Sequence, residues 1–300
     1  MIRGFGLLAL AATMATAGLT ASHMVPQQRP DPSAPQIGPG IPLTLAQDRA
    51  RRVSDLRYRL HFSIRPEPGS PIAGRVTLTF TLSSAAAPLA LDFAEPKLVR
   101  SVRVGGTAVT PAVATDHIVI APANLRAGKN EIEIEFTAGD AALNRTPEFL
   151  YSLFVPARAH LTFPVFDQPD LKARWTLSLE VPEGWEALAN GAETARSVKD
   201  GRQQLTFAET QPLSTYVFAF AAGRFSVETA ERNGRTFRML HRETDAAKVA
   251  RNRDAVFDLH AAAIAWLERY TGIAYPWGKF DFLLVPSFQF GGMEHPGAIF

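Results

Sequence analysis

Apolar and polar residues alternate with a period of two along much of the chain before residue 240. Successive side chains of a β-strand point to opposite faces, so this alternation is typical of half-buried antiparallel strands. We therefore expect a mainly β region with one face of each strand in a core and the other in water. The runs that show the alternation are 56–64, 76–82 and 131–136, with shorter runs at 89–93, 102–104 and 118–121.

Short turn sequences separate several of these runs. Asp200-Gly201 and Asn233-Gly234 are pairs suited to type I′ hairpin turns, and Gly105-Gly106 indicates a further turn. Residues 216–221 are continuously apolar, which predicts a strand that is covered on both faces.

The hydrophobic period changes after Leu240. Apolar residues then recur at helical spacing, which predicts an amphipathic helix that starts near Asp245 or Ala246 and ends at Gly272. A strand is expected at 279–285. The change from pure β to helix-then-strand marks a domain boundary near residue 240. The residues of the apolar stripe are Val256, Leu259, His260, Ala263, Trp266, Leu267 and Tyr270.

Four histidines lie in or beside these elements. His61, His117 and His160 have no Asp, Glu or His at ligand spacing, so we interpret them as exposed or hydrogen-bonded strand residues. His260 has no second histidine or carboxylate four positions on, which favours a core histidine over a metal ligand.

The N-terminus is typical of a secretory signal over residues 1–21, with Arg3 before an apolar run from Phe5 and small residues up to Ala21. A disordered or membrane-retained N-terminus is the alternative. Residues 22–50 are rich in proline, and because proline disrupts helices and sheet ladders we expect a linker there.

Composition excludes several classes of function. The chain has 300 residues, of which 46% are hydrophobic, and a net charge of +2, so a nucleic-acid partner has no support. It has no cysteine, which excludes a thiol nucleophile, a Cys-ligated metal and a lipoprotein anchor. No Gly-x-Ser-x-Gly sequence occurs, so a nucleophilic hydrolase is not indicated. No membrane anchor is expected after signal cleavage, and the sequence does not indicate an oligomeric state.

The segment that carries candidate chemistry is Gly291-Gly292-Met293-Glu294-His295. Adjacent glycines let a backbone approach a ligand closely. One carboxylate follows them, and Pro296-Gly297 then turns the chain. By itself, a glutamate after two glycines is more typical of a solvated loop.

A second segment, residues 166–173 with the sequence Phe-Asp-Gln-Pro-Asp-Leu-Lys-Ala, precedes an alternating strand. It is a proline-containing turn in which Asp167 and Asp170 can accept hydrogen bonds from backbone N–H groups. We interpret most of these residues as structural.

Together the two segments resemble hallmarks of the M1 zinc aminopeptidases. The first is similar to the family's Gly-x-Met-Glu-Asn exopeptidase motif, with His295 in place of the usual Asn, and the second to its Phe-Asp-x-Pro-Asp-x-Lys-Ala segment. The resemblance spans residues 54–300. It implies an N-terminal antiparallel β-sandwich or saddle domain at 51–235, followed at 236–300 by the truncated start of an α+β thermolysin-like domain with the motif on its edge strand.

The resemblance also implies roles for the motif residues. The backbone of Gly291, Gly292 and Met293 would hydrogen-bond a peptide substrate, and Glu294 would bind its free α-ammonium group. His295 would affect local geometry and specificity. The family often places a Gln or Glu before its second segment, but residues 154–156 offer none, so no specificity residue is assigned there.

The zinc that the family uses is held by a His-Glu-x-x-His helix and a later Glu. No such sequence occurs in residues 1–300, so the resemblance implies that the ligands lie beyond residue 300 and that this chain alone is inactive. We expect the N-terminal part of an exported, periplasmic or extracellular zinc aminopeptidase that acts on peptides with a free N-terminus. The alternative is a non-catalytic binding or scaffold module of the same lineage. His295 slightly favours this alternative, whereas Glu294 and the two glycines favour the enzyme.

Overall fold

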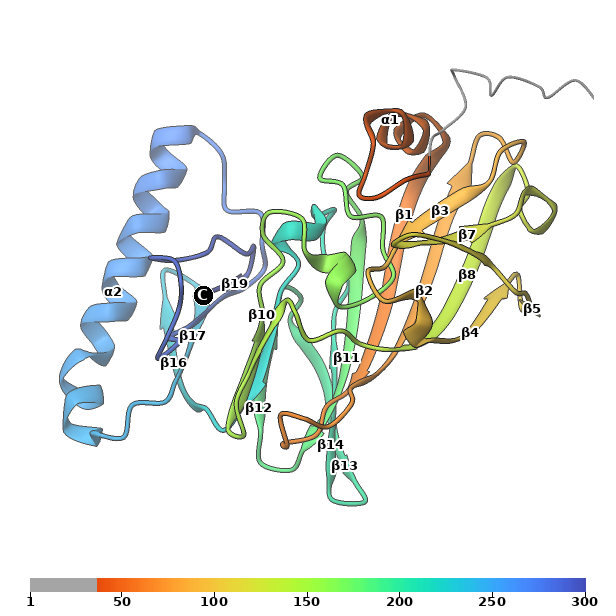
Figure 1. Cartoon of the computed structure of the whole chain (residues 1–300). Helices are drawn as coiled ribbons and strands as arrows, with labels where there is room; N and C mark the ends of the chain where they lie inside the picture. The colour runs from red at the N-terminus through yellow and green to blue at the C-terminus, as the bar shows by residue number, and fades with distance from the viewer. Residues whose placement is uncertain (1–36) are drawn as a thin grey trace, which may run out of the picture. The chain divides into compact units, whose positions relative to one another are not determined.

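Residues 37–300 are described by a computed structural model (Figure 1). The expected signal peptide, residues 1–21, lies outside the described residues, as does the expected linker up to residue 36. The last part of that linker is not irregular, because helix α1 spans Leu43–Arg52 and follows Pro42 directly. Proline is tolerated at a helix start, where the first N–H groups have no intrahelical acceptor. The prolines therefore limit where the helix begins without preventing it.

The largest sheet has eight strands in the order β13-β14-β11-β1-β2-β8-β4-β5. Alternate residues of its long strands are buried, as the period-two pattern predicts. One pair differs from the expectation of antiparallel strands, because β1 and β11 run parallel with Leu60 opposite Leu177. A parallel pair needs a long crossover, which the chain between these strands provides. The bounds are β1 Val53–Ser63, β2 Ala73–Leu82, β4 Val99–Val104, β5 Thr107–Ala108, β8 Gly128–Thr137, β11 Arg174–Pro182, β13 Glu193–Lys199 and β14 Arg202–Phe207.

Two smaller sheets pack with the large one around a single core. The ring of Phe62 in β1 stacks on Phe220 in β15 with centroids 5.3 Å apart, and Trp175 stacks on Tyr58 at 4.2 Å and on Phe218 at 4.4 Å. The sheets have the orders β12-β15-β10-β9 and β3-β7-β6. Their strands are β3 Leu89–Asp92, β6 Ala112–Ala114, β7 His117–Ile120, β9 Leu143–Arg145, β10 Phe149–Ser152, β12 Glu186–Ala189 and β15 Phe220–Gly223. The mainly β domain is thereby confirmed.

Local predictions hold at the turns and fail at one strand boundary. Asp200 and Gly201 both have positive φ (51° and 69°), as do Asn233 and Gly234 (52° and 73°), which is type I′ geometry. The apolar run at 216–221 starts as a 3₁₀ turn rather than a strand, since Thr215–Val217 forms η4 and β15 begins only at Phe220. The other 3₁₀ turns are η1 Pro96–Leu98, η2 Pro122–Asn124 and η3 Ala159–Leu161.

The remaining elements form a fourth sheet, in the order β16-β17-β18-β19, with one long helix against it (Figure 1). The sheet already begins at Ser226, before the domain boundary expected at 236, because β16 and β17 form one hairpin. Among residues 37–300, no helix combines the length and apolar character needed to cross a bilayer. The bounds are β16 Ser226–Arg232, β17 Arg235–His241, α2 Ala246–Thr271, β18 Phe280–Leu283 and β19 Ala298–Ile299.

Helix α2 starts and ends where the sequence predicts. The side chain of Asp245 accepts a hydrogen bond from the backbone N–H of Lys248 at 3.0 Å, and Gly272 ends the helix with φ 68°. The expected apolar stripe is nevertheless largely uncovered, with Leu259 68% and Tyr270 76% exposed. The residues that α2 buries are Phe257, Ala261 and Ile264. Helical spacing identifies a stripe of apolar residues, but it does not say which stripe meets the sheet.

Candidate functional site

The motif residues 291–295 lie in a loop between β18 and β19, not in a strand. The backbone N–H of Met293 donates to the carbonyl of Phe300 at 2.8 Å, and the N–H of Phe300 donates back to Met293 at 3.2 Å. This pair of hydrogen bonds closes the loop. The edge-strand position that the resemblance implies is therefore replaced by a closed loop at the sheet edge.

The two glycines leave their backbone open. Neither has a positive φ, and a Cβ at Gly291 would meet no atom within 4 Å, while one at Gly292 would lie 3.5 Å from the carbonyl oxygen of Phe300. Neither glycine is thus required by its φ or by crowding from the described residues. What they provide is uncovered peptide backbone, since both are exposed.

Glu294 is exposed and lines an apolar groove of about 490 Å³. The groove runs between the C-terminal half of α2 and the loop, and its walls include Leu267, Tyr275 and Ile299. Glu268, another carboxylate on the groove, lies 2.5 Å from Arg235, and this ion pair lowers its pKa. Glu294 has no ion-pair partner among residues 37–300, so its carboxylate is available to a cation from outside.

The motif does not line a single hollow. Gly291 and Gly292 border a second one of about 550 Å³, whereas Glu294 and His295 border the first. The two hollows share His260 and Ile299 in their walls. The structure therefore places the glycine backbone and the carboxylate on adjoining depressions.

The side chain of His295 is fully buried. Its ring packs edge-on against Phe300 at 4.7 Å, and neither ring nitrogen has a hydrogen-bond partner in the described part of the chain. Burial lowers the pKa of His295 to about 4, so the ring is neutral at neutral pH. An effect of His295 on a ligand would pass through the conformation of the loop.

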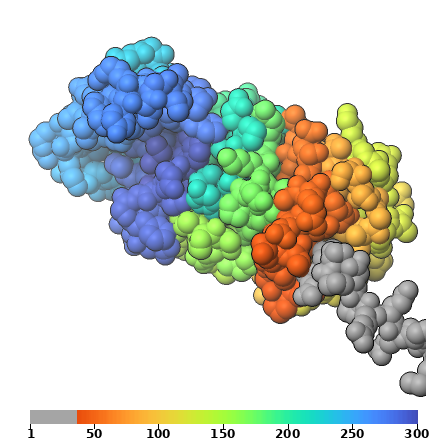
Figure 2. Space-filling model, turned by 90° about the horizontal axis from the view of Figure 1, so that it is seen from above, coloured from red at the N-terminus to blue at the C-terminus, as the bar shows by residue number. Residues whose placement is uncertain are grey.

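Polar contacts attach this loop to its surroundings. The hydroxyl of Tyr151 in β10 donates to the carbonyl of Ser287 at 3.1 Å, and the Phe288 ring packs against the Tyr151 ring at 5.6 Å. The ammonium group of Lys279 donates to the carbonyl of Gly297 and lies 2.9 Å from Asp281. Figure 2 shows the C-terminal residues, in the darkest blue, between helix α2 and the green strands of the β-domain.

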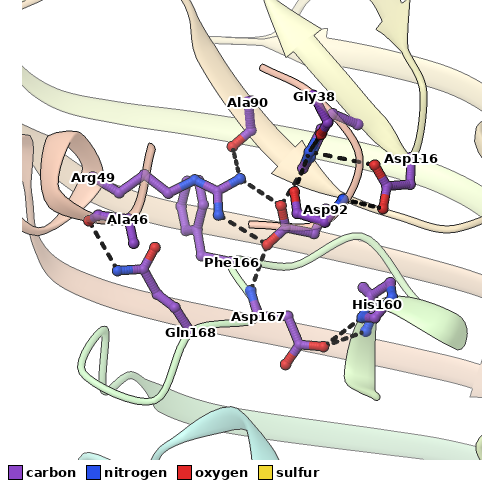
Figure 3. A network of polar contacts seen from close by, with 12 residues as sticks. Gly38, Ala46, Arg49, Ala90, Asp92, Asp116, His160, Phe166, Asp167 and Gln168 are labelled. Atoms are coloured by element: carbon purple, nitrogen blue, oxygen red, sulfur yellow. Dashed lines mark hydrogen bonds and ion pairs between the residues drawn. The ribbon is translucent and has the colours of Figure 1, made fainter. Parts of the chain in front are cut away.

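The second segment of the sequence analysis belongs to a buried polar network (Figure 3). The backbone N–H of Asp167 donates to Asp92 at 2.7 Å, and the Asp167 carboxylate accepts from the backbone N–H of His160 at 3.0 Å and lies 2.7 Å from its Nδ1. Arg49 of α1 holds both oxygens of Asp92, at 2.5 and 2.9 Å. These contacts tie α1, β3 and the segment together, which supports the structural interpretation of Asp167.

The four histidines interpreted from the sequence, His61, His117, His160 and His260, are engaged in hydrogen bonds or ion pairs. His61 contacts the hydroxyl of Ser178 at 3.0 Å, and His260 contacts the carbonyl of Val256 at 2.8 Å. His117 is fully buried beside Asp92, with its Nδ1 2.9 Å from that carboxylate. The sequence could not reveal this pairing because Asp92 lies far from His117 along the chain.

The residues that the structure describes do not suit the zinc ion of the family. Within 37–300 there is no group of three or more His, Cys, Asp or Glu side chains that could hold a metal.

Comparison with known proteins places this geometry in context. Residues 54–217, more than half of the chain, match the family model described as Peptidase M1 N-terminal domain, and 256–300 match the Peptidase family M1 domain. Aminopeptidase N of Streptomyces lividans is 27% identical over 279 residues, which cover 87% of this chain and 32% of that protein. Glutamyl aminopeptidase of Sus scrofa is 35% identical over 149 residues, which cover 48% of this chain and 15% of that protein.

A solved structure shares the fold. The M1 zinc metallopeptidase from Deinococcus radiodurans superimposes with a TM-score of 0.66 at 19% identity, covering 83% of this chain and 60% of that one. This chain thus spans about a third or less of the length of the two curated relatives named above. Its β-domain, its two sequence hallmarks and the family match over more than half its length agree: the chain belongs to the M1 family of peptidases.

Proposed function

We propose that this chain is part of an aminopeptidase in which Glu294 binds the free α-ammonium group of a peptide. The observation that carries the proposal is the exposed carboxylate of Glu294, which lines an apolar groove and has no ion-pair partner among residues 37–300. Membership of the M1 family and relatives named as aminopeptidases support it. Zinc is part of this proposal as the family's Lewis acid, although the described residues hold no site for it.

The residues present can do three things for such a reaction. An ammonium group held by Glu294 fixes the N-terminal end of the substrate, so a blocked or internal peptide bond cannot take the same place. The exposed backbone of Gly291 and Gly292 can pair with the extended peptide. A bound peptide would displace water from the apolar walls of the groove, which strengthens the attraction of the ion pair.

The test is Glu294→Ala in the protein produced from its complete gene. A peptide that fills the groove would cover the exposed carboxylate, and breaking an ion pair buried in this way costs about 3–5 kcal/mol, which is roughly two to four decades in rate if it is fully expressed in the transition state. We expect kcat/KM on an aminoacyl amide to fall by that factor. Glu294→Gln, which keeps the shape and loses the charge, should behave similarly.

Glu183→Ala is a matched control, because Glu183 is also exposed and lies in the turn before β12. It should leave kcat/KM unchanged. Wild-type kcat/KM in Glu294→Ala would remove the role proposed for this residue. A non-catalytic peptide-binding module is the alternative function, and binding of peptides with a free N-terminus without any hydrolysis would favour it.

We also propose that the protein is exported. The support is the charged, apolar and small-residue order of residues 1–21. Cell fractionation and N-terminal sequencing should find a mature protein outside the cytoplasm that begins after Ala17 or Ala21. A cytoplasmic protein that keeps its first residues would contradict export and leave the peptidase proposal intact.

A further inference from the structure

Asn190, which directly follows β12, is buried and touches the loop of Glu294. Its side-chain amide donates to the carbonyl of Pro296 at 3.0 Å and to the carbonyl of Val217 at 3.0 Å. Its side-chain oxygen accepts from the backbone N–H of Ala219 at 2.7 Å. One side chain thus joins the end of β12, the turn before β15 and the loop.

The contacts determine the orientation of the amide group. An asparagine NH₂ has two donors, and both point at carbonyl oxygens, while the side-chain oxygen faces an N–H. If the amide group were flipped, the side-chain oxygen would face the carbonyl oxygens of Pro296 and Val217, and the NH₂ group would face the N–H of Ala219. The side chain is therefore locked, and the carbonyl of Pro296 is held at one place relative to the β-domain.

A second observation shows how closely the loop approaches Asn190. Gly297 has φ +71°, and a Cβ at that position would lie 2.7 Å from the backbone carbonyl oxygen of Asn190. A non-glycine residue would meet both strain and a backbone clash there. The loop backbone is thus seated directly on residue 190, two and three residues after Glu294.

We propose that Asn190 is a positioning residue of the site: through Pro296 it holds the loop so that the Glu294 carboxylate keeps its place on the groove. The inference rests on the proposed role of Glu294. The β-domain then contributes to substrate binding through a side chain that does not touch the substrate.

The test is a double-mutant cycle in the protein produced from its complete gene. Asn190→Ala should lower kcat/KM on an aminoacyl amide roughly tenfold to hundredfold, since it leaves buried carbonyl groups without their donor. In the Glu294→Ala background the same change should have almost no further effect, because the carboxylate that it positions is gone. A merely structural role would lower activity by the same factor in both backgrounds.

Ser152→Ala is the matched control. Ser152 is also fully buried, and its hydroxyl accepts from the backbone N–H of Phe220 at 3.0 Å in the same small sheet, but it has no hydrogen bond to the loop. Both variants should lower the Tm. Only Asn190→Ala should speed hydrogen exchange at the paired amides of Met293 and Phe300 and show the non-additivity with Glu294→Ala.

Gly297→Ala disturbs the adjacent contact of the loop with the backbone carbonyl of Asn190 and leaves the β-domain's side chains unchanged, so it replaces Asn190→Ala should that variant not fold. We expect the same faster exchange and the same non-additivity. Equal losses in both backgrounds, with exchange at Met293 and Phe300 as in wild type, would overturn the positioning role. A silent Glu294→Ala would instead defeat the proposed function, and the exchange rates alone would then decide whether Asn190 anchors the loop.

Discussion

The β-domain and the C-terminal region, residues 226–300, are held in place in different ways. In the β-domain the alternating apolar residues meet across three sheets, and the charged groups that enter the core, such as Arg49 and Asp92, are paired there. In the C-terminal region the stripe on α2 is exposed at Leu259 and Tyr270. The loop of the candidate site is attached to the β-domain by two hydrogen bonds and by Met293 and Phe300, whose side chains are buried in the β-domain core. The β-domain is a scaffold in its own right, and the loop takes its position from that scaffold.

The largest loss of stability is expected from Asp92→Asn, in the β-domain. The substitution removes the negative charge that faces Arg49 and His117, both fully buried, and so leaves uncompensated positive charge in the core. We expect the free energy of unfolding to fall by about 3–5 kcal/mol. Chemical denaturation would measure the loss. Asp170→Asn, at an exposed carboxylate, is the control and should change stability by less than about 0.5 kcal/mol; equal effects of the two would contradict the importance of the network.

A smaller effect, dependent on pH, is expected from His117. Its Nε2 lies 2.9 Å and 2.8 Å from the carbonyl oxygens of Gly38 and Gly40, and its Nδ1 faces Asp92, so both nitrogens need a proton. Burial opposes the charged ring, but the hydrogen bond and charge of Asp92, with the charge of Asp116, outweigh it and raise the pKa of His117. Arg49 is the cation that faces the same carboxylate.

A raised folded-state pKa means that protonated His117 stabilises the fold fully below its unfolded pKa of about 6.5, and that this stabilisation is lost as the pH rises through the folded-state value. The free energy of unfolding of wild type should therefore exceed that of His117→Gln by about 1–3 kcal/mol near pH 6, and this difference should shrink at higher pH. Unfolding of both proteins across the pH range would show this. A difference that grows with pH would contradict the protonated state.

The smallest effect is expected on the exposed face of α2. Leu259→Ala should change the free energy of unfolding by no more than about 0.5 kcal/mol, because the side chain is largely in water. Ile264→Ala on the same helix removes a buried side chain, so it should cost about 2–5 kcal/mol. Thermal or chemical unfolding would compare them, and a large loss from Leu259→Ala would show that this face is covered in solution.

Sequence reasoning succeeds where the determinant is local. Alternation predicts the strands of the β-domain. Asn233-Gly234 predicts the turn between β16 and β17, and Asp245 and Gly272 predict the ends of α2. Neighbouring residues determine each of these features. Helix α1 is missed because the prolines before it conceal its start. The buried stripe of α2 is missed because its choice depends on which sheet the helix meets.

The candidate site is predictable only in part for the same reason. The motif identifies Glu294, but the division of its residues between two hollows follows from the path of the loop. Asn190 and Pro296 are 106 positions apart, and Arg49 and Asp92 are 43 apart. No spacing rule in a single sequence links such pairs, so these contacts require the structure.

The order of the largest sheet has a consequence for how copies of the chain meet one another. An open sheet ends in strands whose unpaired backbone groups can recruit a strand from a second molecule and begin aggregation. Here one outermost strand, β5, has only two residues. The other, β13, is irregular between Glu193 and Ala195, and Arg196 reaches across to Glu186 and Glu193 at 2.7 Å each. Both edges of the sheet thus carry the features by which natural sheets discourage edge-to-edge pairing. The eight-stranded sheet can therefore stay open without pairing with the sheet of another molecule.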